Sequence, residues 1–202
     1  MKLAIVDYGA GNLKSVANAL THLGAQFKIA ETPEAIEASD AVLFPGVGHF
    51  GQMATSLDEL RLRSSLLAKI GGGAPFLGIC VGMQALYKAS EESPEAQGLG
   101  VFPGEVRKLR GNVRVPHLGW DDLETVRDCP LLKGIDPSAR FYFANSFAAD
   151  LGGETASTCA YGDSSWAAIV RQGSLFGVQF HPEKSGENGL RLLKNFLEIA
   201  GC

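Results

Sequence analysis

The chain has 202 residues, of which 46% are hydrophobic and 20% are charged, and its net charge is −4. This length and composition predict one compact domain over residues 1–202, and the lack of a basic stripe argues against a nucleic-acid partner. No run of about 18 apolar residues occurs and an acid interrupts the apolar N-terminus early, so we expect no membrane anchor and no signal peptide. The cysteines lie far apart, so we expect no disulfide framework and no metal site. Together these features predict a cytoplasmic location.

Short apolar runs alternate with stretches of helical period in the first 80 residues, which is typical of a sheet covered by helices on both faces. Strands are predicted at residues 3–6, 27–29, 41–44 and 75–79. The recurrence of apolar residues from Leu13 to Leu23 predicts a helix that stops at Gly24. A second helix is expected to end before the glycines at 71–73, with an apolar face made of Met53, Leu57, Leu60 and Leu67.

The pattern changes between about residues 99 and 180 to short strand-like pieces with many turns. Residues 141–143 and 175–180 are examples, and we expect these pieces to form the second half of one sheet, with hairpin additions. A last helix is predicted to pack on the sheet with a face made of Leu190, Leu193, Leu197 and Ala200. The predicted fold class is therefore α/β, a single-domain open mixed sheet flanked by helices.

A cysteine stands between two glycines in the segment Gly78-Ile79-Cys80-Val81-Gly82, where an apolar strand gives way to a helix. This arrangement is typical of a nucleophile elbow, whose tight turn needs small neighbours. A helix that begins behind Cys80 would also favour its thiolate. The alternative is a buried, inert cysteine, but the glycines and the strand-to-helix setting favour a nucleophile.

The segment His181-Pro182-Glu183 follows an apolar strand that ends at Phe180. A cysteine nucleophile needs a base, and the base needs a group that orients it. The spacing places both side chains on one side of an extended segment, at the strand edge where open α/β sheets hold their active sites. Taken alone, such a pair is more often part of a surface turn.

An elbow cysteine in mid-chain together with a late His-Pro-Glu resembles the class I, or triad, glutamine amidotransferases over nearly the whole chain. The resemblance implies a flavodoxin-like core. It also implies that Cys80 attacks the side-chain amide of L-glutamine, that His181 protonates the departing ammonia, and that water hydrolyses the thioester. Glu183 would be the orienting group.

Backbone donors for the oxyanion are implied by the segment Pro45-Gly46-Val47-Gly48, which resembles the oxyanion strand of this family. We expect donors around Val47 and Gly48, with the N–H of Val81 as the other. The resemblance further implies substrate contacts at Gly46, Gln84, Glu92, Asn145, Ser146 and Phe147. At Phe147 the family more often has tyrosine, so a hydroxyl contact is missing, and residues 93–97 next to Glu92 are expected to form a variable loop.

Four further segments, residues 7–15, 116–120, 142–146 and 181–186, resemble the glutaminase subunits of imidazole glycerol phosphate synthases. The resemblance implies a heterodimer with a cyclase subunit that uses the ammonia, because this chain contains no synthase domain. It places Asn12, Trp120 and Lys184 at or near the interface. Without the resemblance, Trp120 would be expected in the core.

Other functions remain open at this point. Gly9-Ala10-Gly11 after the first strand suggests a nucleotide loop, but the pattern GxGxxG is incomplete, so a helix-entry loop is favoured and no cofactor is expected. A non-catalytic module with the same fold is a second alternative, against which the three triad residues are all present. A free-standing cysteine peptidase or γ-glutamyl hydrolase is a third, and it would turn over fully without a second protein.

Overall fold

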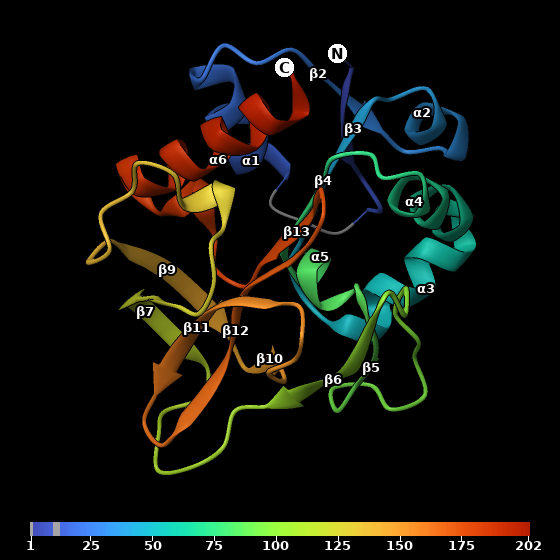
Figure 1. The fold of residues 1–202 in the computed structure, drawn as a ribbon. Helices are drawn as coiled ribbons and strands as arrows, with labels where there is room; N and C mark the ends of the chain where they lie inside the picture. The colour runs from blue at the N-terminus through green and yellow to red at the C-terminus, as the bar shows by residue number, and fades with distance from the viewer. Residues whose placement is uncertain (1, 10–12) are drawn as a thin grey trace.

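A mixed sheet of eight strands forms the centre of the computed structural model, which describes residues 2–9 and 13–202 (Figure 1). The pairs are parallel from β2 to β13 and antiparallel from β13 to β8. In spatial order the strands are β2 (Phe27–Ala30), β1 (Leu3–Val6), β3 (Ala41–Gly46), β4 (Phe76–Cys80), β13 (Leu175–Val178), β12 (Ser164–Gln172), β11 (Thr155–Tyr161) and β8 (Glu124–Thr125). The parallel part has the order of a flavodoxin-like sheet, in which ligands bind at the carboxyl ends of the strands.

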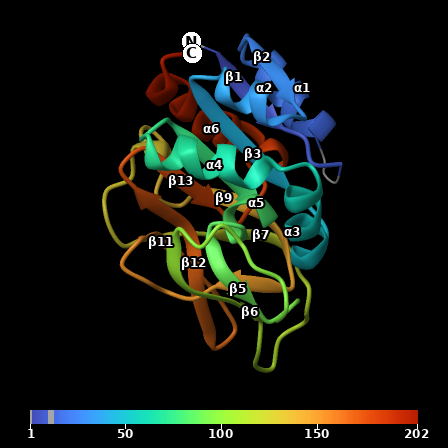
Figure 2. The same ribbon diagram turned by 90° about the vertical axis from the view of Figure 1, so that its right-hand side faces the viewer.

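Helices cover both faces of the parallel strands (Figures 1 and 2). On one face lie α1 (Leu13–His22) and α6 (Gly186–Ala200), and on the other lie α2 (Pro33–Glu37), α3 (Phe50–Glu59) and α4 (Leu62–Gly71). β1, β3 and β4 are buried along their whole length because they are covered on both sides. The predicted α/β class, with an open mixed sheet flanked by helices, is confirmed.

The region from 99 to 180 differs from the expected second half of one sheet. Only part of it joins the central sheet. β5 (Tyr87–Ser90), β6 (Phe102–Lys108) and β10 (Phe147–Ala149) form a separate three-stranded sheet, while β7 (His117–Asp122) pairs with β9 (Arg140–Asn145) in an antiparallel ribbon. Alternation along a strand indicates which face is buried, but it does not indicate which strand is the neighbour.

The expected single helix before the triple glycine is wrong, because two helices occupy this region. Arg61 has a left-handed backbone with φ 57°, which ends α3 and starts α4 in a new direction. Leu60 and Leu67 are therefore 40% and 37% exposed instead of packing beside the buried Met53 and Leu57. Within the described parts of the chain, no helix combines the length and apolar character needed to cross a membrane.

Candidate active site

Cys80 is the last residue of β4, and the one-turn helix α5 (Val81–Gln84) begins directly after it. Its backbone has φ 54° and ψ −110°, a conformation that is strained for any residue with a side chain. Cys80 is 4% exposed and opens on a pocket of about 360 Å³. The strand-to-helix turn expected around this cysteine is therefore present, although its helix is much shorter than a typical one.

Three glycines allow this turn to lie against its neighbours. A Cβ on Gly82 would overlap the carbonyl oxygen of Phe44 in β3, and a Cβ on Gly78 would lie 2.5 Å from the carbonyl oxygen of Gly82. A Cβ on Gly46 would lie 2.6 Å from the nitrogen of Gly82. Gly46 pairs with Cys80 across β3 and β4, so the contacts bring the expected oxyanion strand next to the cysteine.

His181 and Glu183 are joined by a hydrogen bond of 2.8 Å between Nδ1 and Oε1, and their side chains are only 3% and 1% exposed. The expected extended segment is wrong in one respect: Glu183 lies in the short 3₁₀ helix η2 (Pro182–Lys184), and only His181 is extended. Burial lowers the pKa of His181, but hydrogen bonds and charge from Cys80 and Glu183 outweigh burial and raise it to about 10.

Gln179 is a buried residue of the site that the sequence analysis did not identify. Its Nε2 donates to Sγ of Cys80 at 3.6 Å, and its Oε1 accepts from Nε2 of Gln84 at 3.1 Å. Gln84 also donates to the carbonyl oxygen of Phe147 at 3.0 Å. A polar residue two positions before His181, in an otherwise apolar strand, was the available signal.

The pocket beside Cys80 gathers most of the residues expected to bind the substrate. Its walls include Val47, Gly48, Val81, Gln84, Glu92, Asn145, Ser146, Phe147, His181 and Lys184. Gly46 lies behind this wall, against the elbow. The described residues contain no cluster of three or more His, Cys, Asp or Glu side chains that could hold a metal ion.

The backbone N–H of Val47 lies near the hydroxyl of Tyr8, a fully buried residue just after β1. Burial raises the pKa of Tyr8, and the N–H of Val47 partly opposes this rise. Within the described residues, the hydroxyl makes no hydrogen bond of standard geometry. The Val47 amide thus lies near the buried hydroxyl of Tyr8 without a standard hydrogen bond to it.

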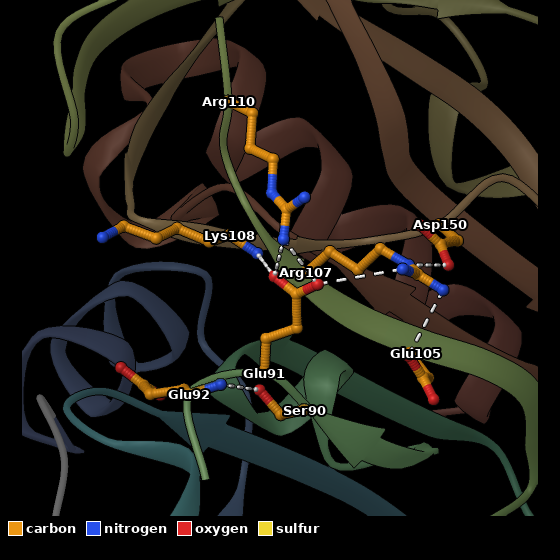
Figure 3. A network of polar contacts seen from close by, with 8 residues as sticks. All are labelled: Ser90, Glu91, Glu92, Glu105, Arg107, Lys108, Arg110 and Asp150. Atoms are coloured by element: carbon orange, nitrogen blue, oxygen red, sulfur yellow. Dashed lines mark hydrogen bonds and ion pairs between the residues drawn. The ribbon is translucent and has the colours of Figure 1, made fainter. Parts of the chain in front are cut away.

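Glu92 follows β5, whose end is held by ion pairs on the small sheet (Figure 3). Glu91 accepts hydrogen bonds of 3.0 Å from Arg110 and from the backbone N–H of Lys108, and these contacts lower its pKa. The N–H of Glu92 donates to Oγ of Ser90 at 3.2 Å. The position of Glu92 in the pocket wall is therefore supported from the sheet side.

The ribbon β7–β9 is tied to the histidine. The backbone N–H of His181 donates to the carbonyl of Tyr142 at 2.9 Å, and the N–H of Tyr142 donates to Oγ of Ser185 at 2.9 Å. Ser185 in turn donates to the carbonyl of His181 at 2.7 Å. Any shift of β9 at Tyr142 therefore acts directly on the backbone of His181.

Two of the three expected interface residues lie beside this connection. The ring of Trp120, which is 49% exposed, packs edge-on against Tyr142 with 6.0 Å between centroids. Nζ of Lys184 lies 5.9 Å from the centre of the same tyrosine ring. The third, Asn12, lies outside the described residues.

Comparison with known proteins agrees with this geometry. The family model for class I glutamine amidotransferases matches residues 4–200. The imidazole glycerol phosphate synthase subunit HisH of Methanothermobacter thermautotrophicus is 44% identical over 198 residues, which cover 98% of each chain. The chloroplastic imidazole glycerol phosphate synthase hisHF of Arabidopsis thaliana is 41% identical, over 96% of this chain and 34% of its own length.

Solved structures give the same result. A crystal structure of a glutamine amidotransferase superimposes with a TM-score of 0.77 at 26% identity, covering 98% of this chain and 99% of that one. The chain therefore belongs to the class I glutamine amidotransferases and, among them, to the family of the HisH subunits.

Proposed function

We propose that the chain hydrolyses L-glutamine to glutamate and ammonia and delivers the ammonia to a separate cyclase subunit. The cyclase would use it to make imidazole glycerol phosphate and AICAR from PRFAR in histidine biosynthesis, in the cytoplasm. The observation that carries the proposal is the buried constellation in which Cys80 and His181 line one pocket and Glu183 forms a hydrogen bond with His181. The HisH relatives support the pathway, and the four free cysteines agree with a reducing compartment.

In the first half of the reaction, the thiolate of Cys80 attacks the amide carbon of the glutamine side chain. The charge that develops on the amide oxygen requires N–H donors, and Val81 offers the first N–H of α5 directly behind the cysteine. His181, charged because its pKa is raised, then gives its proton to the amide nitrogen, the carbon–nitrogen bond breaks, ammonia leaves and a γ-glutamyl thioester remains on Cys80.

In the second half, neutral His181 takes a proton from a water molecule, which attacks the thioester carbon. The carbon–sulfur bond breaks, glutamate leaves and the thiolate of Cys80 is restored. Glu183 keeps the imidazole oriented through its 2.8 Å bond to Nδ1, so that Nε2 is the atom that exchanges protons with the substrate. Gln179 adds a hydrogen bond to the sulfur.

The cyclase is expected to bind the surface that includes Trp120 and Lys184, and to switch the oxyanion strand. The proposed switch is motivated by Val47, whose amide lies near the buried hydroxyl of Tyr8. A donor turned towards Tyr8 would not be available to the substrate, and a missing donor costs about 2.7–4 kcal/mol, or roughly 10²–10³ in rate. A partner that binds the turned peptide more tightly would shift the oxyanion strand to its active orientation. The chain would then release ammonia only when an acceptor is present.

The test is to assay Cys80→Ala in the complex with the cyclase. Glutamine-dependent synthesis should be abolished, whereas synthesis from added ammonium salts should continue, because Cys80 serves only to release ammonia. Glutamine hydrolysis at the wild-type rate by Cys80→Ala would exclude the proposed nucleophile. Full turnover of the isolated wild-type chain, unchanged by the cyclase and its ligand, would instead favour a free-standing hydrolase.

A further inference from the structure

Glu92 is part of the pocket wall and also contacts the start of a helix. Its Oε2 accepts a hydrogen bond of 2.7 Å from the backbone N–H of Phe50. Phe50 is the first residue of α3, where backbone N–H groups have no partner within the helix. A negative charge at this end also interacts favourably with the helix dipole. The bond joins residues that are 42 positions apart in the chain.

The segment fixed by this bond is the expected oxyanion strand. β3 ends at Gly46 and α3 begins at Phe50, so only residues 47–49 lie between them. Pairing of Gly46 with Cys80 holds the upstream end, and Glu92 holds the downstream end. A link of three residues with both ends fixed has few backbone conformations available, so its ends limit the orientations that the amides of Val47 and Gly48 can adopt.

The residue after Glu92 makes a second contact with the same segment. Oγ of Ser93 lies 3.4 Å from Nδ1 of His49, the residue that caps α3 by accepting from the N–H of Gly51 at 3.2 Å. A Cβ on Gly51 would lie 2.5 Å from Oγ of Ser93. The loop and the beginning of α3 are therefore closely packed at this point.

The loop itself is fastened on both sides of Glu92. On one side are the ion pairs of Glu91 with Arg110 and Arg107 (Figure 3). On the other side Arg63 donates to the carbonyls of Gln97 and Gly98, at 3.1 Å and 2.5 Å. The loop that carries Glu92 is thus held in place on both sides. A residue that positions a backbone segment needs such rigid support.

We propose that Glu92 is a positioning residue for the oxyanion strand in addition to a ligand for the amino group of glutamine. Its carboxylate caps α3 and thereby fixes the link that carries the Val47 and Gly48 amides. A carboxylate has two oxygens, so Oε2 can hold Phe50 while Oε1 binds the ammonium of the substrate. Substrate binding and alignment of the oxyanion donors would then be coupled through one side chain. The inference rests on the proposed function, because it assumes that an oxyanion forms at Cys80.

Two substitutions separate the two roles. Glu92→Gln keeps an oxygen for the N–H of Phe50 but removes the charge, whereas Glu92→Ala removes both. In the complex with the cyclase and its ligand, both variants should raise KM for glutamine by about ten- to a hundredfold, the effect of a lost charged hydrogen bond. Only Glu92→Ala should also lower kcat, by at least about tenfold and by no more than the roughly 10²–10³ that a fully lost donor costs. Glu95→Ala, an exposed carboxylate of the same loop, is the matched control and should change neither constant.

Amide hydrogen exchange at Phe50 gives a second readout that does not depend on activity. Exchange should be slow in the wild type, in Glu92→Gln and in Glu95→Ala, and fast in Glu92→Ala. Equal effects of the two Glu92 variants on kcat, or unchanged exchange at Phe50 in Glu92→Ala, would overturn the positioning role. If the wild-type complex failed to hydrolyse glutamine, the proposed function would fall instead, and the exchange data would tell the two failures apart.

Discussion

His181 is buried between two partners that can carry negative charge, and this environment determines its protonation. Its pKa is about 10 in the folded chain, against about 6.5 for an unperturbed histidine. Because the folded value is the higher one, protonated His181 stabilises the fold fully below pH 6.5, and this contribution is lost as the pH rises towards 10.

Replacement of Cys80 by alanine is therefore expected to lower the pKa of His181. The hydrogen bond with Cys80 is the largest effect that raises this pKa, so its removal leaves burial less opposed. Titration of the His181 ring protons by NMR measures the change, and the pH-dependent fall in the free energy of unfolding, which starts near pH 6.5 in both proteins, should be smaller and end at a lower pH in the variant. A pKa that stays at the wild-type value would mean that Glu183 alone sets it.

The base and its orienting group should differ in their effect on rate. His181→Ala should lower kcat for glutamine hydrolysis by about 10²–10⁴, the usual contribution of a proton-transferring group. Glu183→Gln should lose less, because the amide keeps the shape and some hydrogen bonding to Nδ1. Steady-state kinetics in the complex with the cyclase provide the comparison, and equal, negligible losses in both variants would be incompatible with a triad.

Among the elements, the elbow shows what the sequence can and cannot predict. Glycines two positions before and after Cys80 indicate a tight strand-to-helix turn, because the backbone demand is local. The contact of this turn with Gly46 is not local, and it follows from the pairing of β3 with β4. The position of Gly46 in the expected oxyanion strand was predicted from the family resemblance, but its role as a spacer against Gly82 was not.

Longer-range features had weaker signals or none. The capping of Phe50 by Glu92 joins residues 42 positions apart, so no local pattern could reveal it. Arg61 takes a left-handed backbone without being glycine, and periodicity therefore continued the helix through it. The separate sheet of β5, β6 and β10 was missed because partner choice depends on how whole elements pack.

A methyl group at Gly82 is expected to disrupt the elbow. Gly82→Ala would place its Cβ onto the carbonyl oxygen of Phe44, so either the turn into α5 or the paired strand β3 would have to shift. The variant should lose about 1–3 kcal/mol of stability or more, and glutaminase activity with it. Chemical denaturation and the assay in the complex test this together, and a variant with wild-type stability and kcat would show that the contact is not tight.

On the scale of the whole molecule, a single residue, Tyr142, connects the proposed partner surface with the backbone of His181. Trp120 rests on Tyr142, and the carbonyl of Tyr142 holds the N–H of His181. A displacement of the exposed tryptophan by a partner would therefore reach the proposed base through β9, a route distinct from the one through the oxyanion strand.

Trp120→Ala should weaken binding of the cyclase by about 2–4 kcal/mol, as expected for a tryptophan at the centre of an interface. It should also reduce the stimulation of glutaminase activity at saturating cyclase. Titration calorimetry gives the affinity, and kinetics give the stimulation. Ile29→Ala is a suitable control, since Ile29 is a 40% exposed apolar residue on β2, an edge strand of the central sheet, whereas Trp120 lies on the separate β7–β9 ribbon. Equal behaviour of the two variants would place the interface elsewhere.

The three glycines at the elbow also affect the unfolded ensemble, because they raise its backbone conformational entropy. A glycine has more backbone freedom to lose on folding than any other residue, so each of them lowers the stability of the chain, and the contacts described above prevent their replacement. Improved thermal stability must therefore come from glycines that are not enclosed. At Gly71, the last residue of α4, a Cβ would meet nothing within 4 Å and φ is not left-handed. Gly71→Ala should raise the free energy of unfolding by about 0.4–1 kcal/mol while kcat stays unchanged, as measured by denaturant titration and the glutaminase assay. A loss of stability in this variant would mean that α4 needs the glycine at its end, and the entropy of the unfolded chain would then not be the term that limits this protein.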